Sequence, residues 1–99
     1  MLRHIVLLKF KEEATPARRA ELAAAFEALA SKIPQVQSLE WGLNASPEGL
    51  DKGFTHNFLV TFANDAGRDA YLPHPAHLAF VAQLKPWLAD LLVVDYTPR

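Results

Sequence analysis

The stretch RHIVLLKFK, residues 3–11, decides the fold because neither side of it is polar. Valine and isoleucine favour extended chain and no glycine or proline interrupts the run, so we expect a β-strand. Successive side chains of a strand point to opposite faces. The two faces carry His4, Val6, Leu8 and Phe10 on one side and Ile5, Leu7 and Lys9 on the other. Because both faces are mostly apolar, this strand is expected to be covered on both sides.

Three further strands are predicted, at residues 36–44, 54–62 and 91–96. The segments VQSLEWGLN and FTHNFLVTF alternate apolar and polar residues, which is typical of strands with one buried side. The segment LLVVDY is apolar on both faces until Asp95, like the first strand. The polar loop ASPEGLDKG separates the two alternating strands.

Two helices are predicted between these strands. Thr15 and Pro16 provide the N-cap and the first residue of the earlier helix, and Pro34 ends it. The later helix begins at Pro75, and Pro86 is expected to kink or restart it because proline removes a helical hydrogen bond. Its apolar stripe is predicted to comprise Leu78, Val81, Leu84, Leu88 and Leu91.

The order of elements is β-α-β-β-α-β, which indicates a single α+β domain over residues 1–99 with a ferredoxin-like arrangement. A short helical turn over residues 64–71 is expected before the later helix. Right-handed crossovers place both helices on one face of an antiparallel four-stranded sheet, with strand order 4-1-3-2. The other face is left bare although two of its strands are apolar there. We therefore expect a homodimer joined sheet to sheet.

Composition excludes several classes of function. The net charge of the 99 residues is −1 and the basic residues are scattered, so no nucleic-acid partner is expected. No apolar run approaches the length of a membrane span, and no signal peptide is recognised, so a cytoplasmic protein is expected. The absence of cysteine removes disulfides and thiolate nucleophiles. No glycine-rich phosphate motif occurs, so no nucleotide cofactor is expected.

The segment YLPHPAH, which begins at Tyr71, contains half of the four histidines and defines the candidate site. In the predicted topology it starts at the end of the sheet where the first strand begins with His4 and the last strand finishes with Asp95. Tyr71, His77, His4 and Asp95 are therefore expected to converge. His56 begins its strand at the opposite end, roughly 20 Å from Tyr71 at about 3.3 Å per residue.

Among these residues, His77 is the candidate general base. With His74 as the N-cap, His77 is the third residue of its helix, where the positive helix end and burial both disfavour imidazolium. A neutral imidazole can accept a proton, and Asp95 or His4 can orient its ring. The Tyr71 hydroxyl can donate to a developing enolate or carbonyl oxygen. The group is typical of a site for removing a proton next to a carbonyl.

The same residues also have a structural interpretation, because such constellations are only probabilistic signs of function. A histidine at a helix start can be a hydrogen-bonded cap, and His4 bonded to Asp95 can be a latch between strand ends. A metal site at His74 and His77, with Asp95 or His4 as a third ligand, is the weaker alternative. His74 lies outside the regular helix and no second carboxylate cluster exists, so no metal is expected.

Five pieces of the sequence resemble the stress-responsive dimeric α/β-barrel (Dabb) family. They are HIVLLKFK at the start, WG at 41–42, GFTH at 53–56, YLPHPAH at 71–77 and VVDYTPR at the end. The resemblance covers essentially the whole chain. It implies a ferredoxin-like protomer whose sheet packs against that of a second copy to close a barrel, in agreement with the two-sided apolar strands.

The resemblance also implies a set of site residues. In polyketide-cyclising members, which close their substrate by an aldol reaction without a cofactor, the acid/base tyrosine and histidine fall on Tyr71 and His77. Other pocket residues of those members fall on His4, His56 and Asp95. Matching motifs also occur in members with no known catalysis, so the resemblance leaves both catalytic and non-catalytic functions open.

The expected ligand pocket is more apolar than the one that the resemblance implies, because Phe26 stands where the cyclising pattern has a tyrosine. Trp41 and Phe58 each belong to the alternating apolar positions of a predicted strand. Aromatic residues at such positions can line a pocket but more often lie in the core or in a dimer interface. The residues predicted to contact a ligand are His56, Phe26, Phe58 and Leu78.

Two functions are therefore expected as alternatives. In the first, a homodimer binds a small hydrophobic, carbonyl-bearing metabolite and cyclises or isomerises it by acid/base chemistry that needs no cofactor. In the second, the protein is a non-catalytic stress-response or assembly protein, and the His/Tyr/Asp cluster only secures strand ends and the helix start. Fold alone does not decide between them.

Overall fold

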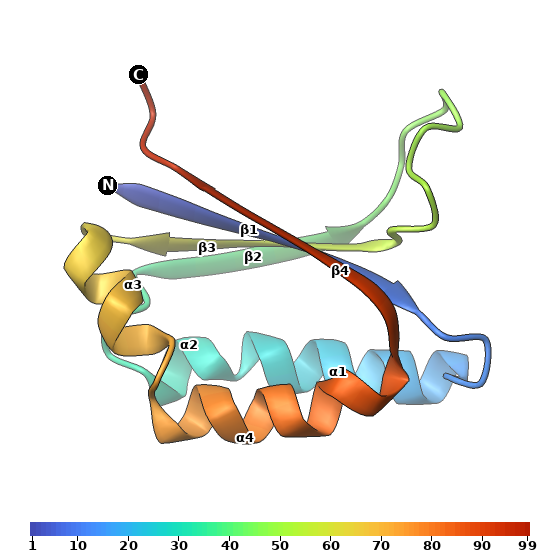
Figure 1. The fold of residues 1–99 in the computed structure, drawn as a ribbon, viewed down its shortest axis with the longest axis horizontal. Coiled ribbons are helices and arrows are strands. Elements are labelled where there is room, and N and C mark those ends of the chain that lie inside the picture. Colours follow the sequence, from blue (N-terminus) through green and yellow to red (C-terminus); the bar gives the residue numbers. More distant parts are fainter.

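An antiparallel sheet of four strands, with every helix on one of its sides, forms the framework of the protein (Figure 1). The structure is a computed structural model that describes all residues from 1 to 99. The elements are β1 (Leu2–Phe10), α1 (Pro16–Glu27), α2 (Leu29–Lys32), β2 (Ser38–Leu43), β3 (His56–Phe62), α3 (Asp65–Tyr71), α4 (Pro75–Leu84), the 3-10 turn η1 (Lys85–Trp87) and β4 (Leu88–Tyr96).

The strand order is β2-β3-β1-β4, which confirms the predicted ferredoxin-like topology. β1 lies at the centre, antiparallel to both β3 and β4. Its register places His4 directly opposite Asp95, at the end of the sheet that carries both chain termini (Figure 1). The predicted meeting of these two residues is thereby confirmed. None of the helices is both long enough and apolar enough to cross a lipid bilayer.

The helix starts are capped as the sequence predicts. The Thr15 hydroxyl accepts the backbone N–H of Arg18 at 3.1 Å, and the Asn64 side chain accepts that of Gly67 at 3.1 Å. His74 caps α4 through its ring, whose Nδ1 accepts the backbone N–H of Ala76 at 3.1 Å. These bonds satisfy donors that have no partner within the helix.

The end of α4 differs from the prediction. Pro86 has no N–H to continue the helix, so the chain tightens into η1 and turns directly into β4 at Leu88. Leu88 and Leu91 are therefore strand residues, and their assignment to the helical stripe was wrong. The strand begins three residues earlier than residue 91, where the sequence analysis placed its start.

The buried face of α4 also differs from the predicted stripe. Phe80 and Leu84 are its buried residues, whereas Leu78 is 55% exposed and lies on the outer side of the helix. A shift of two positions along a helix moves a side chain by about 200°, because each residue turns the helix by about 100°. The periodicity of the segment was right, but the face assigned to Leu78 was wrong.

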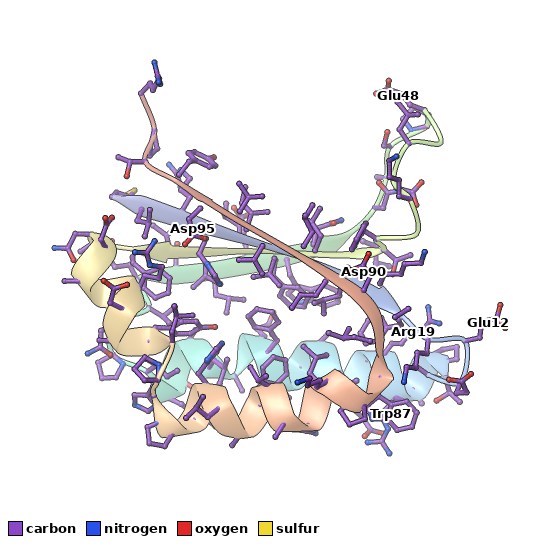
Figure 2. The ribbon with its side chains drawn as sticks, in the orientation of Figure 1. Glu12, Arg19, Glu48, Trp87, Asp90 and Asp95 are labelled. Carbon is purple, nitrogen blue, oxygen red and sulfur yellow. The ribbon has the colours of Figure 1, made fainter.

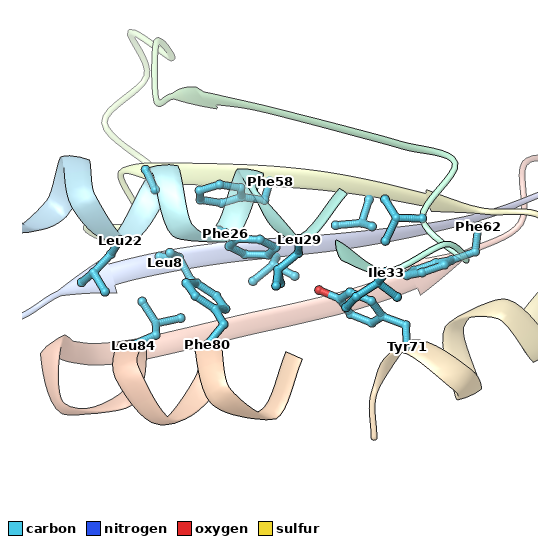
Figure 3. Close-up of a cluster of buried hydrophobic side chains, with 14 of the residues drawn as sticks. Leu8, Leu22, Phe26, Leu29, Ile33, Phe58, Phe62, Tyr71, Phe80 and Leu84 are labelled. Atoms are coloured by element: carbon cyan, nitrogen blue, oxygen red, sulfur yellow. The ribbon is translucent and has the colours of Figure 1, made fainter. Parts of the chain in front are cut away.

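The core between the sheet and the helices is organised around stacked aromatic rings (Figure 3). Phe58 of β3 lies parallel to Phe26 of α1, with ring centroids 4.1 Å apart. Phe58 also stacks on Trp41 of β2, with ring centroids 5.3 Å apart. Offset parallel rings at such distances add to the stabilisation from burial. Phe58 is thus a core residue, in line with the structural interpretation of this aromatic pair.

The opposite side of the sheet has no helix over it, as Figure 1 shows. Apolar side chains nevertheless occupy it: Ile5 and Leu7 of β1 pair with Val94 and Leu92 of β4. Leu92 is 44% exposed and Val94 49% exposed. The two-sided apolar character predicted for the first and last strands is present in the structure. In β4 both sides stay open to solvent in the single chain, since Leu91 and Val93 on the inner side are each 47% exposed.

Phe58→Ala is expected to lower the free energy of unfolding by about 3–5 kcal/mol, because removal of a buried ring that stacks on two others leaves a cavity that cannot collapse easily. Urea unfolding monitored by circular dichroism measures this loss. The control is Leu50→Ala, since Leu50 lies in the β2–β3 loop and is 70% exposed. Equal effects of the two substitutions would contradict the central position of the aromatic stack.

Candidate functional site

A cavity of about 360 Å³ lies between α4, β4 and the inner face of the sheet. This volume is within the range of small-molecule sites. Most of the wall is apolar, and the polar side chains on it are those of His4, Tyr71, His77 and Lys85. The complete lining is His4, Val6, Phe26, Tyr71, Leu72, His77, Phe80, Val81, Leu84, Lys85, Leu88, Leu91 and Val93.

Tyr71 is the last residue of α3 and is completely buried. Figure 3 shows its ring entering the apolar cluster with the hydroxyl oxygen directed among hydrophobic side chains. That hydroxyl is the one buried side-chain polar atom with no hydrogen-bond partner. Burial raises the pKa of Tyr71, so the group remains a protonated donor at any physiological pH. A buried donor without a partner costs free energy, so the unsatisfied hydroxyl of a residue that lines the cavity calls for an explanation.

His77, in the first turn of α4, lies beside Tyr71, with the two ring centroids 4.4 Å apart. Its Nδ1 is 2.9 Å from the carbonyl oxygen of Leu72. A carbonyl can only accept, so Nδ1 carries the hydrogen and Nε2 is left as the acceptor of the neutral ring. Burial lowers the pKa of His77, and the bond to Leu72 partly opposes this; the charges of His4 and His74, when those rings are protonated, would lower it further. The structure thus favours a neutral imidazole here, as the sequence analysis expected.

His4 of β1 lines the cavity and is hydrogen bonded to Asp95 through its Nδ1. Its Nδ1 lies 2.6 Å from Oδ1 of Asp95, and His4 is only 5% exposed. Since a carboxylate only accepts, Nδ1 donates and Nε2 is the nitrogen that remains. The His4 ring lies 6.0 Å from that of Tyr71, measured between centroids. Asp95 does not line the cavity itself, and Figure 2 shows it on β4 toward the α3 end of the molecule.

Arg68 completes this group and was not predicted from the sequence. Its Nη1 donates to Oδ2 of Asp95 at 3.0 Å, while its Nε and Nη2 donate to Asp69 at 3.1 Å each. These two carboxylates raise the pKa of Arg68. The sequence did contain one indication of this role. Arg68 precedes Tyr71 by three residues, which places the two at neighbouring positions on one face of the helix.

Of the four residues predicted to contact a ligand, Phe26 lines this cavity and the other three do not. Phe58 is buried in the core behind and Leu78 lies on the outer side of α4. His56 is at the far end of the sheet, where its ring contacts those of Phe10 and Trp41. The structure thus agrees with the distance estimated from topology, which separated His56 from Tyr71.

His56 has surroundings of its own. Its Nδ1 is 2.8 Å from the hydroxyl of Thr55, and burial, with a further contribution from the Arg19 charge, lowers the pKa of the ring. His56 lines a wide depression between β2 and α1, separate from the cavity that His77 lines. Elsewhere, no group of three His, Cys, Asp or Glu side chains is placed to hold a metal ion, and His74 is engaged as a helix cap.

Comparison with known proteins places the chain among a defined set of relatives. Residues 2–98 match the model of the stress responsive A/B barrel domain, Dabb. Olivetolic acid cyclase of Cannabis sativa is 34% identical over 98 residues, which cover 99% of this chain and 97% of the cyclase.

Two solved structures have the same fold. A hydroxynitrile lyase from Passiflora edulis superposes with a TM-score of 0.93 at 25% identity, covering 99% of this chain and 93% of the lyase. A dimeric ferredoxin-like protein of unknown function from a Jannaschia species superposes with a TM-score of 0.84 at 30% identity, covering 98% of both chains. Because the family model matches residues 2–98 of the 99 residues, the chain belongs to the Dabb stress-responsive A/B barrel family.

Proposed function

We propose that this protein is a homodimeric Dabb protein whose cavity binds a small apolar, carbonyl-bearing molecule of polyketide type. In this proposal the cavity cyclises or isomerises its ligand by acid/base chemistry without a cofactor. The observation that carries it is that Tyr71 lines an apolar cavity and that its hydroxyl is buried without a hydrogen-bond partner. A ligand oxygen is the natural acceptor for such a donor.

Tyr71 supplies the electrophilic half of the chemistry. A carbonyl oxygen placed against its hydroxyl gains negative charge when a proton leaves the adjacent carbon. The hydrogen bond from Tyr71 then becomes stronger than it was in the ground state, which is the condition for lowering a barrier. The apolar walls around the hydroxyl exclude competing water and increase the strength of this interaction.

His77 supplies the basic half. Its Nε2 takes the proton from the carbon next to the carbonyl, and the electron pair of that C–H bond moves onto the carbonyl oxygen held by Tyr71. The resulting enolate carbon can attack a second carbonyl of the same molecule, which closes a ring and leaves an alkoxide that takes the proton back from His77. Alternatively, His77 returns the proton to another position of the enolate, which isomerises the ligand. A neutral histidine suits this step, because an imidazolium cannot accept a proton.

The relatives support chemistry of this kind without specifying it. One is named as a cyclase and another as a hydroxynitrile lyase, and both superpose or align over nearly the whole chain. In this chain Phe26 and Phe80 add aromatic surface to the wall, so the ligand portion next to them is expected to be apolar.

A non-catalytic function is the second candidate, and one observation favours it. His4, Asp95 and Arg68 connect β1, β4 and α3 by hydrogen bonds, which is what a structural latch would do. The bond from His77 to the Leu72 carbonyl likewise secures the start of α4. Tyr71 separates the two candidates, since a latch gives no reason for an unpartnered hydroxyl.

The homodimer is proposed to form through the open side of the sheet. Ile5, Leu7, Leu92 and Val94 make a continuous apolar strip there. Exposed apolar strips of this kind mark interaction surfaces. A second copy can cover the strip with the same residues, as a twofold interface requires. The Jannaschia relative with the same fold is dimeric.

Tyr71→Phe is expected to leave stability unchanged or slightly higher, because no hydrogen bond is lost. Proton exchange next to a carbonyl should slow on the order of 10²-fold relative to the wild type, as when one donor to a developing oxyanion is removed. The probe is a linear alkyl methyl ketone in D₂O, and NMR measures deuterium uptake at the carbons beside its carbonyl. His77→Gln should slow the exchange as well.

Tyr96→Phe is the matched control for this experiment, since Tyr96 is 45% exposed on the open side of the sheet, away from the cavity. Its exchange rate should equal that of the wild type. If the wild-type protein does not accelerate exchange in any ketone of the series, or if both tyrosine variants are equally active, Tyr71 has no catalytic part.

The pH dependence of stability tests whether His77 is neutral when folded. Its pKa is lowered by burial relative to about 6.5 in the unfolded chain, so the unfolded state binds more protons and stability falls as the pH drops below about 6.5. His77→Gln should weaken this dependence, measured as the difference in urea unfolding between about pH 7.5 and about pH 5. The His56 contribution acts in the same direction and should remain. An unchanged dependence would mean that His77 is not desolvated.

Val94→Lys is expected to weaken the dimer at least tenfold, because it places a charge at the centre of the apolar strip (about 1.4 kcal/mol per factor of ten). Size-exclusion chromatography with light scattering at several concentrations measures the mass. Leu78→Lys is the control, since Leu78 is similarly exposed but lies on the outer side of α4. A wild-type protein that is monomeric throughout, or a Val94→Lys protein as dimeric as the control, would rule out this interface.

A further inference from the structure

We propose that Arg68 is a positioning residue that divides the charge of Asp95 and thereby keeps His4 neutral, with its Nε2 available to the cavity. The effect of Arg68 on catalysis rests on the proposed function. The state of the His4 ring itself can be measured without any ligand.

The geometry gives Asp95 two different partners, one for each oxygen. Oδ1 accepts from Nδ1 of His4 at 2.6 Å, and Oδ2 accepts from Nη1 of Arg68 at 3.0 Å. The His4 side chain is 6% exposed, whereas those of Asp95 and Arg68 are 21% and 24% exposed. The carboxylate therefore lies between a buried imidazole and a guanidinium at the protein surface.

Without Arg68, the Asp95 carboxylate would have His4 as its only hydrogen-bond partner. A carboxylate at hydrogen-bond distance favours the protonated form of an imidazole. Arg68 supplies a permanent positive charge to the other oxygen, so the carboxylate is already neutralised and attracts a second proton less. In this arrangement Asp95 orients His4 without charging it.

The remaining charged and titratable groups around His4 support the same balance. Tyr71 on α3 stays protonated and His77 on α4 is disfavoured as a cation, so neither adds a charge. Asp69 lies beyond Arg68, to which it is hydrogen bonded at 3.1 Å, and partly offsets its positive charge at the solvent side. Arg68 is thus the one cation that holds the carboxylate bound to His4.

The charge on His4 matters for the whole cavity. A protonated His4 lowers the pKa of His77 further, so it would weaken the base. It would also present an N–H where a neutral ring presents an acceptor, next to the donor hydroxyl of Tyr71. When His4 is neutral, this end of the cavity has one donor, the Tyr71 hydroxyl, and two acceptors, the Nε2 atoms of His4 and His77.

The test is NMR of the protein labelled with ¹⁵N-histidine, because the ring nitrogens report both the charge and the position of the hydrogen. The His4 signals are assigned by their loss in His4→Gln. In the wild type at about pH 7, the His4 ring is expected to be neutral with its hydrogen on Nδ1. In Arg68→Met, the charged fraction at the same pH should rise several-fold. Arg68→Lys should restore most of the wild-type state, since it keeps the positive charge.

Two controls separate this effect from a general change in charge or folding. Arg18→Met removes an arginine that forms a comparable surface ion pair with Glu21 on α1, and it should leave His4 unchanged. The His56 ring, at the far end of the sheet, should titrate identically in every variant. If Arg68→Met leaves His4 neutral, or if His4 is already charged in the wild type at about pH 7, the proposal is wrong.

A second readout connects the inference to function. The pH profile for ketone proton exchange should change shape in Arg68→Met, with an additional loss of rate at the pH values where NMR shows His4 to be charged, and it should return to the wild-type shape in Arg68→Lys. A purely structural loss would lower the rate at all pH values without changing the shape of the profile, and it would contradict the proposed role. If no ketone exchanges in any variant while the His4 signals change as expected, the proposed chemistry fails and the role of Arg68 stands.

Discussion

The central strand β1 has apolar side chains on both faces, and both faces have to be removed from water. Its inner face meets the helices and supplies Val6, Leu8 and Phe10 to the core. Its outer face carries Ile5 and Leu7, which no helix covers. Burial of apolar surface is the largest favourable contribution to folding, so the first face determines where the helices lie. The second determines where a second copy is expected.

The same strand also accounts for the position of the cavity. His4 interrupts the inner apolar row near the start of β1, and a buried imidazole needs a partner. Asp95 lies directly opposite in β4, so the two residues satisfy each other through the sheet register. Tyr71 and His77 approach this pair from α3 and α4 and leave space rather than filling it. His4, Tyr71 and His77 are therefore concentrated at one end of an apolar chamber.

Sequence reasoning predicted what local chemistry and topology determine. The helix caps at Thr15 and His74 follow from backbone donors, and the meeting of His4 with Asp95 follows from strand order. Sequence reasoning was wrong where the same residues could belong to either of two neighbouring elements. The end of α4 depends on where Pro86 allows a turn into β4, and periodicity alone does not fix this position. Arg68 was missed because its importance comes from a carboxylate 27 residues away.

Two features at this end of the sheet point to different functions, one to a structural latch and the other to ligand binding. In the His4–Asp95–Arg68 chain both carboxylate oxygens of Asp95 accept hydrogen bonds, so the chain stabilises the fold whether or not a ligand exists. The Tyr71 hydroxyl is unpaired, and phenylalanine would occupy the same space without an unsatisfied donor. A protein selected for stability alone gains nothing from that oxygen. The proposed binding site explains why a hydrogen-bonded pair and an unsatisfied donor occur together on rings whose centroids are 6.0 Å apart, whereas a latch explains only the pair.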